Sequence, residues 1–86
     1  MLIIVKPALF TRKTKVTIMN EETQKVEKTF DILVNELSVQ IPKICKETNT
    51  NKILLIGNKN FNAKIGQIIK SNGITQYGLN IEIEYA

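Results

Sequence analysis

The stretch Lys52-Ile53-Leu54-Leu55-Ile56-Gly57 decides the fold, because it has the pattern of a short strand without a polar side. An unbroken aliphatic run between a lysine and a glycine is typical of a strand that is buried on both faces. A second run of the same kind, Met1-Leu2-Ile3-Ile4-Val5, is stopped by Lys6-Pro7. We therefore expect these two strands to pair at the centre of a sheet.

A helix is expected before Lys52–Gly57 in the sequence. Asp31 is a suitable N-cap, and the apolar residues that follow it repeat with the 3.6-residue period of one helix face. These residues are Leu33, Leu37, Ile41, Ile44 and Cys45. Pro42 lies inside this pattern and removes a backbone hydrogen bond to about Ser38, so we expect the helix to be kinked or split there.

A second helix is expected after Lys52–Gly57, and it leads to the last strand. Asn60 caps this helix and Gly73 ends it. Its apolar side consists of Phe61, Ile65, Ile68 and Ile69. Beyond it, Leu79–Tyr85 alternates between apolar and polar residues, which indicates a strand with one face toward solvent.

Two more strands of this alternating kind precede the first helix. Lys13–Asn20 and Gln24–Phe30 both alternate, and the polar residues between them supply a turn. We expect them to form an antiparallel hairpin that continues from Met1–Val5 as a three-stranded meander.

The resulting order of elements is βββαβαβ, in a single domain over residues 1–86. One arrangement places the two apolar strands in the centre and the three alternating strands outside them: a five-stranded mixed sheet of order 3-2-1-4-5, with the first and fourth strands parallel and a right-handed crossover to the fifth. The fold class is therefore α/β with a mixed sheet, and we expect the helices to cover its faces.

This order, over essentially the whole chain, resembles the ribonuclease H-like fold, which ribonuclease H, Holliday-junction resolvases, integrases and each half of actin-like ATPases share. For the enzymes, the resemblance implies acids in the first strand, in the first helix and near the end of the fourth strand, which hold two magnesium ions. Here the first strand has no acid, the fourth ends in Gly57-Asn58, and only Glu36 matches. The resemblance therefore concerns the fold, and the metal-dependent nuclease is a remote alternative.

Basic and polar residues are expected to meet at one end of the sheet. The first and fourth strands are parallel, so the loop after Lys6 and the turn after Gly57 lie side by side, where such sheets bind ligands. The candidate binding residues there are Lys6, Leu9, Phe10, Arg12, Lys13, Asn58, Lys59 and Asn60. Near a helix N-terminus this set suits a phosphate or an acidic protein surface. The alternative is that Lys59 and Asn60 cap a helix while the other cations are solvated.

Leu9 and Phe10 are two large apolar residues in a connection. They either fold back over the core or form an exposed anchor for a protein partner. The sequence leaves both alternatives open.

Composition excludes much catalytic chemistry. The chain has no His and a single cysteine, so it cannot build a His/Cys zinc site, a nucleophile–His pair or an internal disulfide. We expect no metal and no cofactor. No apolar run approaches the roughly 20 residues of a membrane span, so we expect a cytoplasmic protein without a membrane partner.

The expected function is that of a small non-catalytic binding module, not an enzyme, which acts through protein contacts, of the kind that a phage or mobile element encodes to modulate a host complex. The alternative is a nucleic-acid-binding module that uses the basic edge, since the chain has 12 Lys and Arg residues but only 8 Asp and Glu residues. A homodimer through the edge strand Leu79–Tyr85 also stays open.

Overall fold

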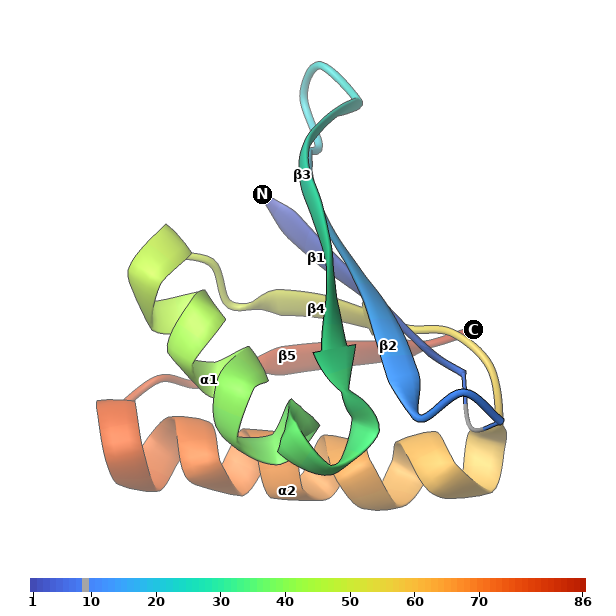
Figure 1. Ribbon diagram of the computed structural model, residues 1–86. Helices are drawn as coiled ribbons and strands as arrows, with labels where there is room; N and C mark the ends of the chain where they lie inside the picture. The colour runs from blue at the N-terminus through green and yellow to red at the C-terminus, as the bar shows by residue number, and fades with distance from the viewer. Residues whose placement is uncertain (9) are drawn as a thin grey trace.

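The computed structural model describes residues 1–8 and 10–86 and contains the expected mixed sheet with two helices (Figure 1). The strands lie in the order β3-β2-β1-β4-β5, which confirms the predicted topology. The elements are β1 (Leu2–Ala8), β2 (Lys13–Asn20), β3 (Lys25–Leu33), the 3-10 turn η1 (Val34–Glu36), α1 (Leu37–Thr48), β4 (Lys52–Leu55), α2 (Lys59–Tyr77) and β5 (Glu82–Tyr85). The last strand is shorter than predicted, since it begins at Glu82 and not at Leu79.

β1 is the centre of the sheet and is longer than predicted. It pairs with β4 in parallel and with β2 antiparallel, and it continues through Pro7 to Ala8. The carbonyl of Val5 accepts a hydrogen bond from the amide of Ile56, so the backbone of Val5 faces β4. Alternate residues of a strand face the same neighbour, so the nitrogen of Pro7 points past the end of β4. The proline therefore removes no bond from the sheet.

Both helices lie on one face of the sheet (Figure 1). The two crossovers, β3 to β4 and β4 to β5, run in the same direction across the sheet, and right-handed connections of that kind must share a face. The expectation that helices cover both faces is therefore wrong. Ile3 and Leu55 point to the helices and are fully buried, whereas their neighbours Ile4 and Leu54 are only half-buried on the open face.

The core lies between the sheet and the helices. It is aliphatic, and α1 contributes the largest share from its inner side. Its fully buried members include Ile3, Val5, Val16, Leu37, Ile41, Cys45, Ile53, Leu55, Ile69 and Ile81. Burial of this apolar surface is the main favourable term for folding.

α1 begins later than predicted. Asp31 does not cap it, because β3 continues to Leu33 and pairs Asp31 with Lys15 of β2. Leu33, expected on the apolar side of the helix, is an exposed strand residue. η1 follows, and α1 then runs through Pro42 as one continuous helix.

α2 is capped by Asn58 and not by Asn60, because the Asn58 side chain accepts a hydrogen bond from the amide of Phe61 at 2.9 Å. It also passes through Gly73, which was predicted to end it, and stops four residues later at Tyr77 before Gly78. Gly78 has a φ of 64° and therefore forms the left-handed C-cap.

Gly73 serves packing. A Cβ at this position would come within 3.2 Å of the carbonyl oxygen of Leu79 and would also press on the side chain of Ile81. A residue without a side chain lets the strand that leads to β5 approach the helix. No helix in the described part of the chain is both long and apolar enough to cross a membrane.

Candidate binding surface

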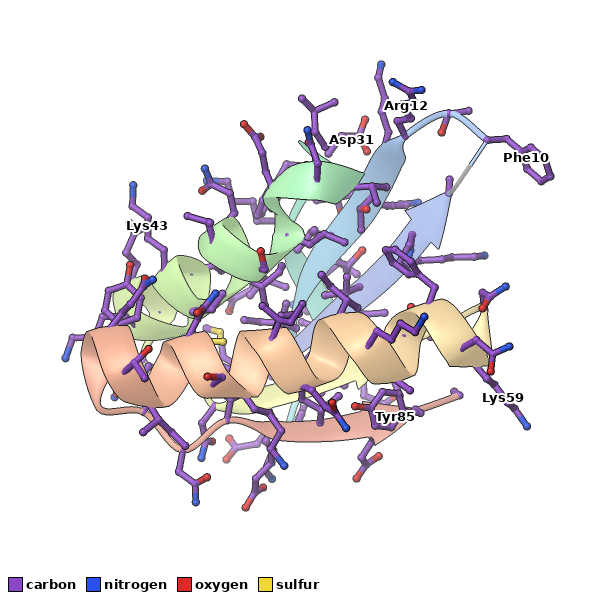
Figure 2. All side chains as sticks on the ribbon, turned by 90° about the horizontal axis from the view of Figure 1, so that it is seen from below. Phe10, Arg12, Asp31, Lys43, Lys59 and Tyr85 are labelled. Carbon is purple, nitrogen blue, oxygen red and sulfur yellow. The ribbon has the colours of Figure 1, made fainter. Side chains whose placement is uncertain are left out.

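The predicted site residues gather at the end of the sheet where β1 and β4 both finish. We call the set Lys6, Phe10, Arg12, Lys13, Asn58, Lys59 and Asn60 the basic pole. Register brings its two halves together, because Val5 pairs with Leu55 and the next amide, Ile56, bonds to the Val5 carbonyl at 2.9 Å. Figure 2 shows Phe10 and Lys59 at the same end of the molecule. Leu9, the eighth predicted residue, lies outside the described residues.

The loop between β1 and β2 is tied down at its base. The amide and the hydroxyl of Thr11 both donate to the carbonyl of Ala8, at 3.2 and 3.3 Å. Arg12 takes a left-handed conformation with a φ of 57°, which turns the chain into β2. Its carbonyl accepts a hydrogen bond from the amide of Val34 at 2.8 Å, so the loop is joined to the start of η1.

Phe10 is fully exposed, with 105% of its reference surface accessible. Its ring points away from the molecule (Figure 2). Of the two alternatives left open for this residue, the structure therefore shows the exposed one. Aromatic anchors of this kind are frequent at protein interfaces.

Four cations surround this part of the molecule. The side chains of Lys6, Arg12, Lys13 and Lys59 are all exposed. Among residues 1–8 and 10–86, ion pairs join Met1 to Glu21, Lys43 to Glu47 and Lys52 to Glu21, and none of them involves a cation of the basic pole. The positive charge of the pole is therefore not neutralised by the described residues.

A shallow hollow of about 660 Å³ lies beside the loop. It is lined by Lys6, Pro7, Ala8, Thr11, Lys13, Lys15 and Asp31. Three lysines against one carboxylate favour an anionic group in it. Lys15 and Asp31 were not predicted as site residues, because they lie within the strands of the hairpin and Asp31 joins the hollow only through the pairing of β2 with β3.

A smaller hollow of about 400 Å³ is lined by Arg12, Leu33, Val34 and Asn35. The sequence pattern did not predict it, because that pattern places Leu33 on the buried side of a helix. The hollow is mainly apolar and would accept a small aliphatic group of a partner next to the Arg12 guanidinium.

The free backbone amides at the N-terminus of α2 find some of their hydrogen-bond acceptors within the chain itself. Asn58 caps it, and Lys59 and Asn60 are exposed residues of its first turn. The preceding turn uses Gly57 at a φ of 126°, a conformation that residues with a side chain rarely adopt. This geometry is a capped helix with two free polar side chains, without a glycine-rich phosphate cradle.

Two buried polar atoms lie beneath the pole. The hydroxyl of Thr14 and the side-chain carbonyl of Asn62 are buried without a hydrogen-bond partner among the described residues. Thr14 lies opposite Pro7 in the sheet, and the Asn62 side chain is 3.9 Å from the position of a Cβ on Gly57. Unpaired polar atoms of this kind lower stability.

Other chemistry-bearing residues lie elsewhere. In the described part of the chain, no three His, Cys, Asp or Glu side chains gather as a metal-binding group. Glu36 is exposed in η1. Cys45 is buried in the core, and this burial raises the pKa of its thiol to about 11, while a backbone hydrogen bond has a weaker, opposite effect.

Comparisons of the chain with models of protein families and with curated proteins find no match. The resemblance to the ribonuclease H-like fold thus stays a prediction based on topology.

Proposed function

We propose that this chain is a non-catalytic binding module that holds an acidic surface of a partner protein on the basic pole, with Phe10 as the apolar anchor. The observation that carries the proposal is the complete exposure of Phe10 on a hydrogen-bonded loop, among four cations that form no ion pair with the described residues. Exposing an aromatic ring to water is unfavourable, so its presence on an anchored loop is best explained by burial in a complex.

The chemistry of the partner follows from the neighbours of Phe10. An apolar pocket would take the ring, and carboxylates around that pocket would meet Arg12, Lys13 and Lys59. Charges at the rim of an interface mainly raise the association rate, whereas a buried aromatic residue mainly slows dissociation. The two parts of the basic pole should therefore affect binding in different ways.

The experiment is affinity capture from a lysate of the source organism, followed by binding kinetics with the captured protein. Wild type is compared with Phe10→Ala and with the triple variant Arg12→Glu, Lys13→Glu, Lys59→Glu. A matched control, Lys46→Glu, Lys64→Glu, Lys70→Glu, changes the net charge equally on the helices. Loss of a stoichiometric partner from both pole variants and not from the control supports the proposal. Undiminished capture by the triple variant contradicts it.

Nucleic acid is the second candidate, because an exposed ring among cations also suits the stacking of a single-stranded base. The dependence of binding on salt concentration distinguishes a nucleic-acid partner from a protein partner. Binding to phosphates weakens with a log–log slope of roughly −0.7 per contacted phosphate on single strands, whereas an interface centred on Phe10 responds weakly. Anisotropy of a labelled oligonucleotide at increasing salt measures this slope.

A further inference from the structure

The open face of the sheet carries an apolar stripe that no element of the described chain covers (Figure 1). The stripe runs along the parallel pair β1 and β4 and is formed by Leu2, Ile4, Leu54 and Ile56. Register places Ile4 beside Leu54, and the side chains of alternate residues share a face. All four side chains are half-buried, although they lie at the centre of the sheet.

The same two strands have apolar residues on their other face, where the helices bury them. Ile3, Val5, Ile53 and Leu55 are at most 1% exposed. Strands with apolar residues on both faces are typical of sheets that are covered on both faces. The composition of β1 and β4 is thus typical of a sheet with a second cover, which residues 1–8 and 10–86 do not provide.

The two borders of the stripe differ in charge. On the β5 side, Glu82 pairs with Lys52 and Glu84 with Leu54 in the register of the sheet. On the β2 side, the neutral Met19 and Thr17 lie opposite Leu2 and Ile4, and Lys15 lies between Lys6 of β1 and Asp31 of β3. Neither glutamate and neither of these two lysines takes part in the ion pairs found among residues 1–8 and 10–86. A straight partner element along the stripe would meet the two carboxylates on the β5 side and the ammonium group of Lys15 at one end of the β2 side.

An α-helix fits this stripe. Its width of about 10 Å spans the two central strands, which lie about 4.8 Å apart, and leaves its flanks over the neighbouring strands. Helices pack on a twisted sheet nearly along its strands, as α2 does beside β4 and β5 on the other face (Figure 1). A strand of a second sheet would instead need partners for its own backbone groups.

We propose that the open face binds an amphipathic helix of a partner protein, with basic residues on the flank toward Glu82 and Glu84 and acidic residues on the flank toward Lys15. This surface is separate from Phe10 and does not depend on the function proposed for the basic pole. Lys6 and Lys15 border the stripe and also line the hollow beside the basic pole, so both are left unchanged in the tests of either surface.

The probe is a synthetic amphipathic helical peptide of about four turns, with leucine along one face, lysine along one flank and glutamate along the other. A second peptide has glutamate on both flanks. Binding to wild type, to Glu82→Lys with Glu84→Lys, and to a control with Glu22→Lys and Glu47→Lys is measured by fluorescence anisotropy. Amide shifts in NMR spectra identify the face that is bound.

Wild type should bind the first peptide, with shifts centred on Ile4 and Leu54. The double change on β5 should weaken this binding about tenfold and strengthen binding of the all-glutamate peptide, since two exposed charge pairs are worth about a factor of ten. The control should behave as wild type. These substitutions are at exposed positions, and circular dichroism verifies the fold.

Each of three results with the peptides overturns the proposal: no binding of the first peptide, amide shifts centred on the basic pole, or a β5 change that leaves both affinities unaltered. A wild-type dimer in light scattering, with face amides that shift as protein concentration rises, would also overturn it, because the cover would then be a second copy.

Discussion

The side-chain amide of Asn72 in α2 donates a hydrogen bond of 2.8 Å to the backbone carbonyl of Ser38 in α1. This carbonyl is the one that a residue at position 42 would normally reach, and Pro42 has no amide hydrogen to donate. The two helices are therefore joined at the point where α1 lacks a bond of its own. The bond explains how α1 stays continuous through a buried proline.

Asn72→Ala should lower the free energy of unfolding by about 1–2 kcal/mol, because the Ser38 carbonyl loses its partner. In a Pro42→Ala background the same change should cost clearly less, since the helix then supplies its own hydrogen bond. Urea denaturation of the two single variants, the double variant and wild type measures the coupling. Equal effects of Asn72→Ala in both backgrounds would show that the two residues act independently.

The strand order was predictable because it depends on local patterns. The unbroken runs Met1–Val5 and Lys52–Gly57 indicated central strands, and the alternating segments indicated outer ones. The boundary between β3 and α1 was not predictable. Asp31 has the local character of a helix cap, but pairing with Lys15, which is distant in the sequence, holds it in the sheet. Gly73 similarly has the local character of a helix end, and the positions of Leu79 and Ile81, which the sequence pattern does not give, explain why a glycine is needed inside the helix.

The candidate site was predictable to the same extent. Parallel strand ends bring Lys6 and Lys59 to one end of the molecule, and that follows from topology alone. The exposure of Phe10 does not follow from topology, because an apolar residue in a loop is compatible with burial or with exposure. The hydrogen bonds of Thr11 and Arg12 hold the loop in the conformation that exposes the ring. The open face was also missed, since apolar strands predict burial without saying what provides it.

Gly73→Ala should destabilise the protein by about 1–3 kcal/mol even though alanine is the better helix former by about 1 kcal/mol. The added methyl group would press on the backbone of Leu79 and on buried Ile81, neither of which can move freely. Gly66→Ala is the matched control, because the three atoms nearest to its Cβ all belong to the half-exposed side chain of Tyr85, which can swing into solvent. Thermal melts should therefore show a clear loss for Gly73→Ala and a smaller change for Gly66→Ala. The reverse order would contradict this packing.

Stability should fall at high pH partly because of Cys45. Burial raises the pKa of its thiol from 9.0 to about 11. Between these values the unfolded chain releases the thiol proton while the folded chain keeps it, so ionisation favours unfolding. This stability is fully present below pH 9, and up to about 2–3 kcal/mol is lost as pH rises to 11.

The contribution of Cys45 is isolated by comparing two proteins that differ only at this position. Unfolding free energies of wild type and Cys45→Ala are compared from pH 8 to pH 11 by denaturation under reducing conditions. The alanine variant is less stable at pH 8 because it leaves a cavity, and the gap should narrow as pH rises. A constant gap would show that the thiol ionises equally in both states.

Phe10→Ala should leave stability unchanged within about 0.5 kcal/mol, because the exposed ring contributes no packing to the core. Phe61→Ala is the matched control. Its ring is partly buried against the core, so its removal should cost at least about 2 kcal/mol and lower the melting temperature by several degrees. For the partner captured with wild type, Phe10→Ala should raise the dissociation constant at least tenfold, mainly through faster dissociation. If Phe10→Ala instead lowered the melting temperature as much as Phe61→Ala does, the ring would be part of the core in solution, and the anchor on the basic pole would have to be abandoned.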